Sequence, residues 1–439
     1  MEEKSTLFQP TRIRLNFKKA FSYLFFNSLI TISLLILSSI VNLLFIKVAA
    51  LYLTRSSFGT LICLVNMMMI IIVPCGAFQI FTSRHITHFL TENEYGKAYH
   101  FFIKVVRMSI MGALILALLF FIFKNQLASF FQMSHGEVFQ LLGIIIFLLL
   151  PFQIYLGFFQ GSKSFRSYGC AILTESCARL LLGYAMLSNH GEIVGVVVAF
   201  IGSYGAALIL CFVIMRKKIM CWKLYPYHSN RDDGASINNF FIILVSLSVY
   251  SIIVFSDVLL VKHFFSPELA GDYGAAANIG RFFFFIPLPL ITVMYPKIVE
   301  QHHQRNEGEI RFVFLNIIFA VALSCVTFIA ICYLFSSEII KIFLDIEKYA
   351  HIGFLIHYVS IIMSLLVLSN VVLHYNIARN RFTYFIVIAC GVAIQIAAIC
   401  FYHDSLKMIV QILLLNALFI FLFLMLLTLY QDRKGRFER

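Results

Sequence analysis

Residues 273–290 read YGAAANIGRFFFFIPLPL, an almost wholly apolar run with Arg281 in its middle. The rest of the chain decides how that arginine should be interpreted. Of the 439 residues, 61% are hydrophobic and only 13% are charged, about half the charged share of an ordinary soluble domain. Apolar runs of roughly 18 or more residues recur along the whole chain, and each can cross a ~30 Å hydrocarbon core as a helix. The sequence therefore predicts an all-α polytopic membrane protein.

The apolar runs divide into twelve predicted transmembrane helices. Strands and open loops are excluded at those depths, because every backbone polar group in lipid must be paired within its own segment. The expected spans are 21–46, 58–82, 105–123, 137–159, 169–188, 193–215, 239–261, 272–296, 312–335, 352–374, 382–402 and 408–430.

The distribution of Lys and Arg sets the orientation, because cytoplasmic loops carry the excess of positive charge. With the N-terminus inside, the inner segments hold 25 of these residues and the outer segments hold 7. Arg179 and Arg281 are left within the membrane. We therefore expect both termini in the cytoplasm, and the net charge of +13 needs no nucleic-acid partner to explain it.

The sequence indicates no catalytic, metal or cofactor site. The ten cysteines are scattered without a C-x-x-C pair, and the thirteen histidines have no H-E-x-x-H spacing. No G-x-x-x-x-G-K-[ST] loop is present, so hydrolysis of ATP by this chain is not indicated. We expect a protein that is not an enzyme.

An internal repeat is visible at a shift of 215 residues. It places NLLFIK (42–47) on DVLLVK (257–262), and Phe58-Gly59 on Tyr273-Gly274. A shift of 216 places Lys163 on Arg379. The matches predict two six-helix halves, and an even number of spans in each half makes the repeat parallel. We expect bundles at 1–215 and 239–439, joined by a cytoplasmic loop at 216–238.

Three segments resemble the polysaccharide flippases of the multidrug/oligosaccharidyl-lipid/polysaccharide exporter superfamily, with the O-antigen flippase as the nearest type. They are LTRSSFGTL (53–61), FFQGSKSFRSY (158–168), and FSPELAGDYGAAANIGRF (265–282) with the following YPKI (295–298). In one departure, TRSS (54–57) stands where an acidic, proline-containing turn is common in that family. The number of spans, the two halves and the length also fit.

The resemblance implies transport of an isoprenoid-diphosphate-linked oligosaccharide to the outer leaflet of a bacterial inner membrane. It also implies alternating access with the diphosphate-sugar head in a cationic central cavity. Membrane lipid and other polysaccharide assembly proteins would be its partners. Two alternatives stay open: a multidrug antiporter of the same superfamily, which would favour an acidic cavity, and an integral membrane enzyme of polysaccharide modification.

Arg281 is the main candidate for binding the substrate. A charge this deep in a membrane usually faces a cavity or a partner, and a guanidinium fits phosphate oxygens. The alternative is an ion pair with Asp257, near the outer end of the preceding span. In the repeat Arg281 falls on Asn66, so the helix position itself does not require arginine.

A second candidate is the pair formed by Glu175 and Arg179, which lie four residues apart and so on one helix face. The two could simply neutralise each other. Alternatively, Arg179 could help to hold an anion while Glu175 tunes it or carries protons.

Several other residues have expected structural roles. Gly59, Gly274, Pro74 and Pro289 are candidate hinges, because glycine and proline allow a helix to bend. Lys47 and Lys262 match in the repeat near the outer ends of their spans, where we expect them to anchor the helices at the membrane boundary.

The topology can be tested by labelling cysteines placed one at a time at positions 190, 404, 230 and 306. An impermeant thiol reagent added outside cells should modify cysteines at 190 and 404 and leave those at 230 and 306 unmodified. The reverse pattern would overturn the orientation drawn from the Lys and Arg distribution.

Overall fold

The computed structural model describes residues 17–133, 136–189, 193–225, 234–285, 306–379 and 381–437, together with isolated positions between 290 and 301. These residues form long helices joined by short connections. The helices of the first half are α1 (Phe17–Tyr52), α2 (Arg55–Thr91), α3 (Tyr95–Ile122), α4 (Lys124–Phe130), α5 (Glu137–Gly161), α6 (Phe165–Ser188) and α7 (Ile193–Lys223). Those of the second half are α8 (Gly234–Phe264), α9 (Pro267–Phe285), α11 (Glu307–Leu334), α12 (Ser336–Phe343), α13 (Ile346–Tyr349), the 3₁₀ turn η1 (Ala350–Ile352), α14 (Gly353–Ala378), α15 (Tyr384–Phe401) and α16 (Leu406–Phe437).

The long helices confirm the predicted all-α membrane fold. Eleven helices of the described residues are long and apolar enough to cross a membrane, and each falls on one expected span. The remaining expected span, 272–296, coincides with α9 as far as Phe285, and Pro289 lies outside the described residues. Two short helices, α4 and α12, were not expected.

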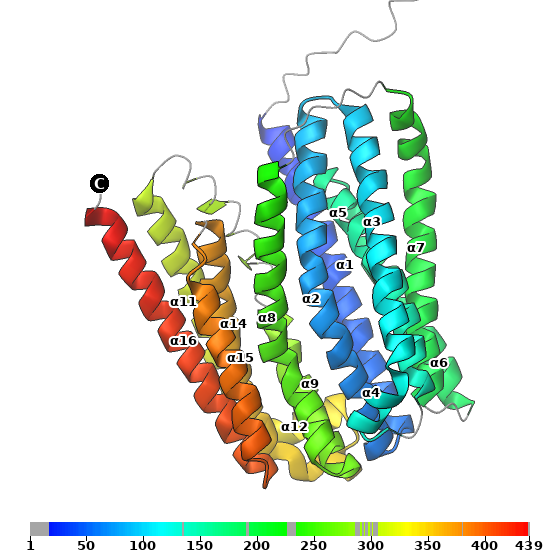
Figure 1. The fold of residues 1–439 in the computed structure, drawn as a ribbon, viewed down its shortest axis with the longest axis vertical. Helices are drawn as coiled ribbons and strands as arrows, with labels where there is room; N and C mark the ends of the chain where they lie inside the picture. Colours follow the sequence, from blue (N-terminus) through cyan, green and yellow to red (C-terminus); the bar gives the residue numbers. More distant parts are fainter. Residues whose placement is uncertain are drawn as a thin grey trace, which may run out of the picture.

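The two halves have the same order of elements. In each half two long helices precede a third, a short helix follows (α4 or α12), and three more long helices complete the bundle. Figure 1 shows the first half on the right and the second on the left, both running in the same direction. This arrangement is the predicted parallel repeat.

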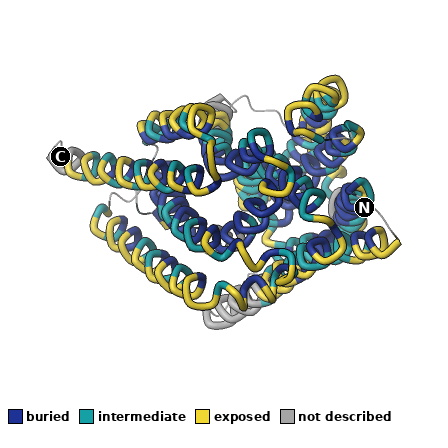
Figure 2. Tube along the Cα trace, turned by 90° about the horizontal axis from the view of Figure 1, so that it is seen from below, coloured by how far each residue is buried: buried dark blue, intermediate teal, exposed yellow. Residues whose placement is uncertain are grey.

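The halves meet mainly through α2, which packs against both α8 and α9. Along α8, the Ser251 hydroxyl donates to the carbonyl of Ile70 at 3.1 Å, and the ring of Phe240 lies 4.8 Å from that of Phe78. In Figure 1 the halves lie close together at the end that carries α4 and α12, the α12 end, and diverge toward the other. Figure 2, viewed from the α12 end, shows exposed residues around the outside and buried ones in the middle.

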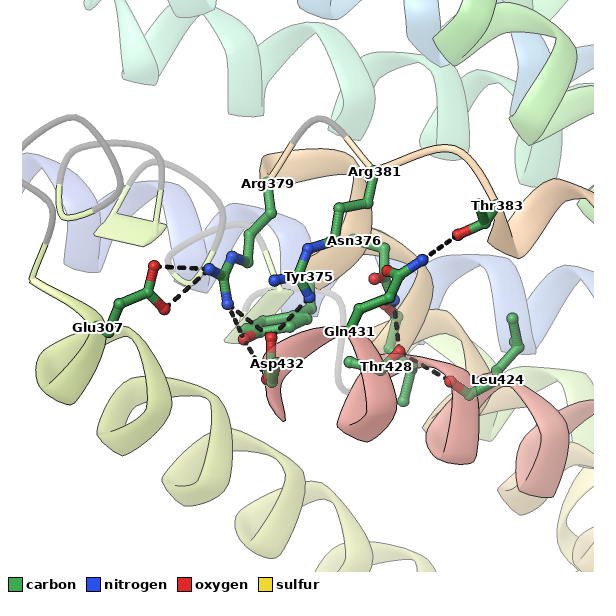
Figure 3. Close-up of polar contacts among 11 residues, drawn as sticks. Glu307, Tyr375, Asn376, Arg379, Arg381, Thr383, Leu424, Thr428, Gln431 and Asp432 are labelled. Atoms are coloured by element: carbon green, nitrogen blue, oxygen red, sulfur yellow. Dashed lines mark hydrogen bonds and ion pairs between the residues drawn. The ribbon is translucent and has the colours of Figure 1, made fainter. Parts of the chain in front are cut away.

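An ion cluster holds three helices of the second half together at the end opposite α12 (Figure 3). Arg379, at the end of α14, donates two bonds of 2.7 and 2.8 Å to the carboxylate of Glu307 on α11. It also donates at 2.6 Å to Asp432 on α16, which accepts from Arg381 at 2.6 Å and from the Tyr375 hydroxyl at 2.9 Å. In the sequence both arginines belong to the 25 inner Lys and Arg residues, and Arg379 is also the repeat match of Lys163, but neither pattern predicted this cluster.

The corresponding helices of the first half are held by aromatic side chains. Tyr95 begins α3, and its ring centroid lies 5.9 Å from that of Trp222 on α7 and 5.1 Å from that of Tyr225. Trp222 in turn packs against Phe158 of α5 at 5.2 Å. Aromatic rings thus join α3, α5 and α7 in the first half, and ion pairs join the corresponding helices α11, α14 and α16 in the second.

The ion cluster predicts that Arg379→Gln lowers the free energy of unfolding by about 3 kcal/mol, because removing one partner strands buried charge. Arg381→Gln should cost less than half as much, since Asp432 would keep Arg379 and Tyr375. Thermal unfolding of the purified protein in one detergent measures both. Equal losses would show that Arg379 is not the centre of the cluster.

Candidate functional site

The second half contains a buried arginine and a buried acid that face each other. Arg281 on α9 is 4% exposed and Asp257 on α8 is 3% exposed, and their side chains form an ion pair. Arg281 also donates through Nε and Nη2 to the carbonyl of Val254 at 3.2 and 3.0 Å. The ion pair raised as an alternative in the sequence analysis is therefore present in this conformation.

The second carboxylate oxygen of Asp257 has its own donor. The Tyr273 hydroxyl, two helical turns before Arg281 on α9, donates to Asp257 Oδ2 at 2.6 Å. The guanidinium is less completely satisfied, because Nη1 of Arg281 is buried without a hydrogen-bond partner among the described residues. The guanidinium therefore keeps one donor that no described residue uses.

The first half contains a comparable group around Arg179. Glu175 and Arg179 form the predicted ion pair on α6, and Arg179 Nη1 donates to Asn42 Oδ1 on α1 at 3.2 Å. The Ser203 hydroxyl donates to Glu175 Oε1 at 3.4 Å, and the guanidinium lies 4.6 Å from the Phe200 ring centroid. Nε of Arg179 is buried without a partner in the described part of the chain.

The two groups lie at corresponding places of the repeat but use different residues. Asn42 corresponds to Asp257, so both arginines meet the same position of the first helix in their half. Arg179 corresponds to Gln395, which donates to Ser256 Oγ of α8 at 3.1 Å. Each half therefore carries one arginine and one acid in this region. In the first half both lie on α6, whereas in the second half the arginine lies on α9 and the acid on α8.

An apolar pocket lies beside the first group. Its lining comes from α2, α5 and α7 and includes Met68, Leu142, Val197 and Phe200. Phe200 also carries the Arg179 guanidinium on its ring, so the pocket and the Arg179 group share a wall.

Lys262 lies near the end of its helix, as expected, but is buried. It is 2% exposed, near the end of α8, and has no hydrogen bond or ion pair with the described residues. The expected boundary anchor is therefore wrong for Lys262, because packing of α8 against other helices covers a position that looks terminal in the sequence. Lys47, its match in α1, is partly exposed.

The candidate hinges differ in their surroundings. Pro74 lies inside α2, which continues as one helix from Arg55 to Thr91. Gly59 permits a close approach, because a Cβ there would lie 2.8 Å from Cα of Gly271 on α9. A Cβ on Gly274 would make an ordinary contact of 3.4 Å with Ile62. Bending at these positions remains a prediction.

Comparison with solved structures identifies the architecture. A structure described as the inward-facing conformation of a multidrug resistance MATE family transporter of the MOP superfamily matches with a TM-score of 0.73 at 15% identity, over 91% of this chain and 95% of that one. The chain has the MATE fold. No family model matches it, and no curated protein matches its sequence.

Two further structures are similar in fold. The outward-facing conformation described for a MATE transporter of the MOP superfamily matches with a TM-score of 0.66 at 14% identity, over 91% of this chain and 96% of that one. A MOP superfamily transporter from Pyrococcus furiosus, whose description reports a binding pocket of reverse polarity, matches at 0.65 and 14% identity, over 94% and 96%.

The Glu175–Arg179 pair generates a prediction. Either single replacement by Gln should lower the free energy of unfolding by about 3 kcal/mol, because it leaves one buried charge without its partner, whereas the double replacement should cost less. Thermal unfolding of the three variants measures the coupling. If the double variant is as unstable as the sum of the singles, the pair is not coupled.

Proposed function

We propose that this protein is a flippase that moves an isoprenoid-diphosphate-linked oligosaccharide, such as an O-antigen repeat unit, across a bacterial inner membrane. The observation that carries the proposal is the spare donor of Arg281, a buried guanidinium with one nitrogen unpaired among the described residues. A diphosphate is a strong anion whose oxygens match the guanidinium fork. The MATE fold supplies the alternating-access framework for such a substrate.

On binding, a phosphate group of the substrate would replace Asp257 as the partner of Arg281. Arg281 therefore need not be an unpaired cation in the resting state. Asp257 keeps its bond from Tyr273 when Arg281 turns toward a phosphate, so the carboxylate is never left bare. Resting neutrality lowers the cost of holding the arginine in a membrane, since an isolated charge there is expensive. Arg179, with its spare Nε and an acid held by Ser203, could act in the same way in the first half.

A multidrug antiporter is the alternative, and several similar structures are described as multidrug transporters. Such a protein binds cations, and the buried acids Glu175, Asp257 and Asp272 would have to serve it. Glu175 and Asp257 are each paired with an arginine that keeps a spare donor, which favours an anionic substrate at these two groups, whereas Asp272 on α9 is paired with His351. The structure with a pocket of reverse polarity supports the premise that one fold can serve substrates of different charge.

The proposal extends to location and partners. Both termini would lie in the cytoplasm, the α12 end would face the periplasm, and the described conformation would be open to the cytoplasm. The lipid tail would remain in the bilayer, and other polysaccharide assembly proteins would supply and receive the substrate.

The proposal is tested by complementation of a flippase-deficient strain, scored by surface polysaccharide and normalised to membrane abundance. Arg281→Ala should reduce export at least tenfold, and Arg281→Lys should restore part of it, because lysine keeps the charge but lacks the fork. The matched control is Arg281→Ala with Asp257→Asn. If the double variant regains export, or if the single alanine variant is fully active, the ligand role of Arg281 is wrong and the ion pair is structural.

A further inference from the structure

We propose that Lys348 is the movable part of a latch that keeps the two halves together at the α12 end. The latch consists of Lys348 and Asp345 in the second half and the carbonyls of Ala50 and Leu51 in the first. The inference rests on the proposed transport cycle for its purpose but not for its geometry.

The contact satisfies the end of a helix. α1 ends at Tyr52, and the last carbonyls of a helix have no partner within it. The carbonyl of Ala49 accepts from the Leu53 amide at 3.0 Å, and those of Ala50 and Leu51 accept from Lys348 Nζ at 3.4 and 2.9 Å. A cation is favoured there by the partial negative charge at a helix C-terminus.

Asp345 sets the position of the lysine. Its Oδ1 caps α13 by accepting from the Glu347 amide at 3.2 Å, and its Oδ2 lies 3.4 Å from Lys348 Nζ. The cap fixes α13, and the ion pair turns the ammonium group toward α1. Contacts within the second half therefore place the ammonium group of Lys348 where it reaches the carbonyls of the first half.

α1 has few other ways to be held against the second half. In the repeat, α1 and α9 correspond to α8 and α2, and α8 and α2 pack closely together. No comparable packing joins α1 to α9 in the described part of the chain, where α1 meets the second half chiefly through α12. The latch therefore closes the less tightly packed side of the molecule.

At the α8 side of this end, the exposed side chain of Gln132 donates to the carbonyl of His263 at 2.7 Å, and His263 Nδ1 lies 2.6 Å from the carbonyl oxygen of Phe130. The contacts nearer α1 differ in kind from that of Lys348. α2 and α9 cross at Gly59 and Gly271, where a Cβ on Gly271 would lie 2.3 Å from the carbonyl oxygen of Arg55. The rings of Phe58 and Tyr349 lie 5.9 Å apart. These are backbone and core contacts, whereas the ammonium group of a one-third-exposed lysine can return to water each time the end opens. Lys348 is therefore the contact near α1 that is suited to repeated breaking.

Lys348→Gln tests the latch, and Lys341→Gln is its matched control. Lys341 lies on α12 at the same end, is exposed, and has no hydrogen bond or ion pair with the described residues. Spin labels on cysteines replacing Asn189, at the end of α6 beside α1, and Phe335, at the start of α12, report the separation of the halves on the latch side in the full-length protein reconstituted in lipid; both positions are exposed. Pulsed electron paramagnetic resonance measures the distribution of distances.

Lys348→Gln should raise the ratio of long to short distances about two- to fivefold, the size expected for one helix-terminal charge, and Lys341→Gln should leave it unchanged. Lys348→Arg should stay close to the parent because it keeps a cation at the carbonyls. An unchanged distribution in Lys348→Gln, or an equal change in Lys341→Gln, would overturn the latch. The measurement contains no substrate, so loss of the flippase proposal would leave its outcome intact.

Discussion

The cost of holding a charge away from water constrains the interior of this protein more than any other interaction. An arginine in a membrane must find an acid, backbone carbonyls or a polar cavity, because its guanidinium stays ionised. Arg281 finds Asp257 and the carbonyl of Val254, and Arg179 finds Glu175 and Asn42. Both groups retain one buried nitrogen without a partner among the described residues. Each group is thus close to neutral and yet keeps a donor that the described residues do not use, and the proposed binding of a diphosphate depends on that donor.

The internal repeat shows which part of this arrangement the architecture requires. The equivalent positions Asn42 and Asp257 both receive an arginine, but it comes from α6 in the first half and from α9 in the second. In the other half of the repeat, Asn66 stands at the position of Arg281 and Gln395 at the position of Arg179. Both donate to backbone carbonyls through their amide groups. A polar residue is thus sufficient for packing at each place. Placing the ions on different helices makes the two halves chemically distinct, as a site between them requires if its substrate has one charged end.

Much of the fold was predictable because long apolar runs leave a membrane helix few alternatives. The short helices α4 and α12 were missed, since seven or eight residues carry too little periodicity to distinguish them from a loop. The sequence suggested both possible roles for Arg281 but could not choose its partner, because Asp257 lies on another helix. Lys262, Arg379 and Arg381 were interpreted from their places at the ends of apolar runs. The burial of Lys262 and Arg379 and the ion pairs of both arginines depend on helices that are distant in the sequence, as Glu307 and Asp432 are from Arg379.

The strengths of these contacts also indicate where the molecule can move. Within the second half, α11, α14 and α16 are joined by charged hydrogen bonds to a buried arginine. Within the first half, the corresponding helices α3, α5 and α7 are joined by packed rings. Breaking either set exposes buried groups, so each half should move as one body. Between the halves, the side opposite the α2–α8 contact depends on a lysine at the end of a helix, which loses little on returning to water. A rocking motion about α2 and α8 would therefore break these weaker contacts first and leave both arginine groups, which lie within the halves, intact.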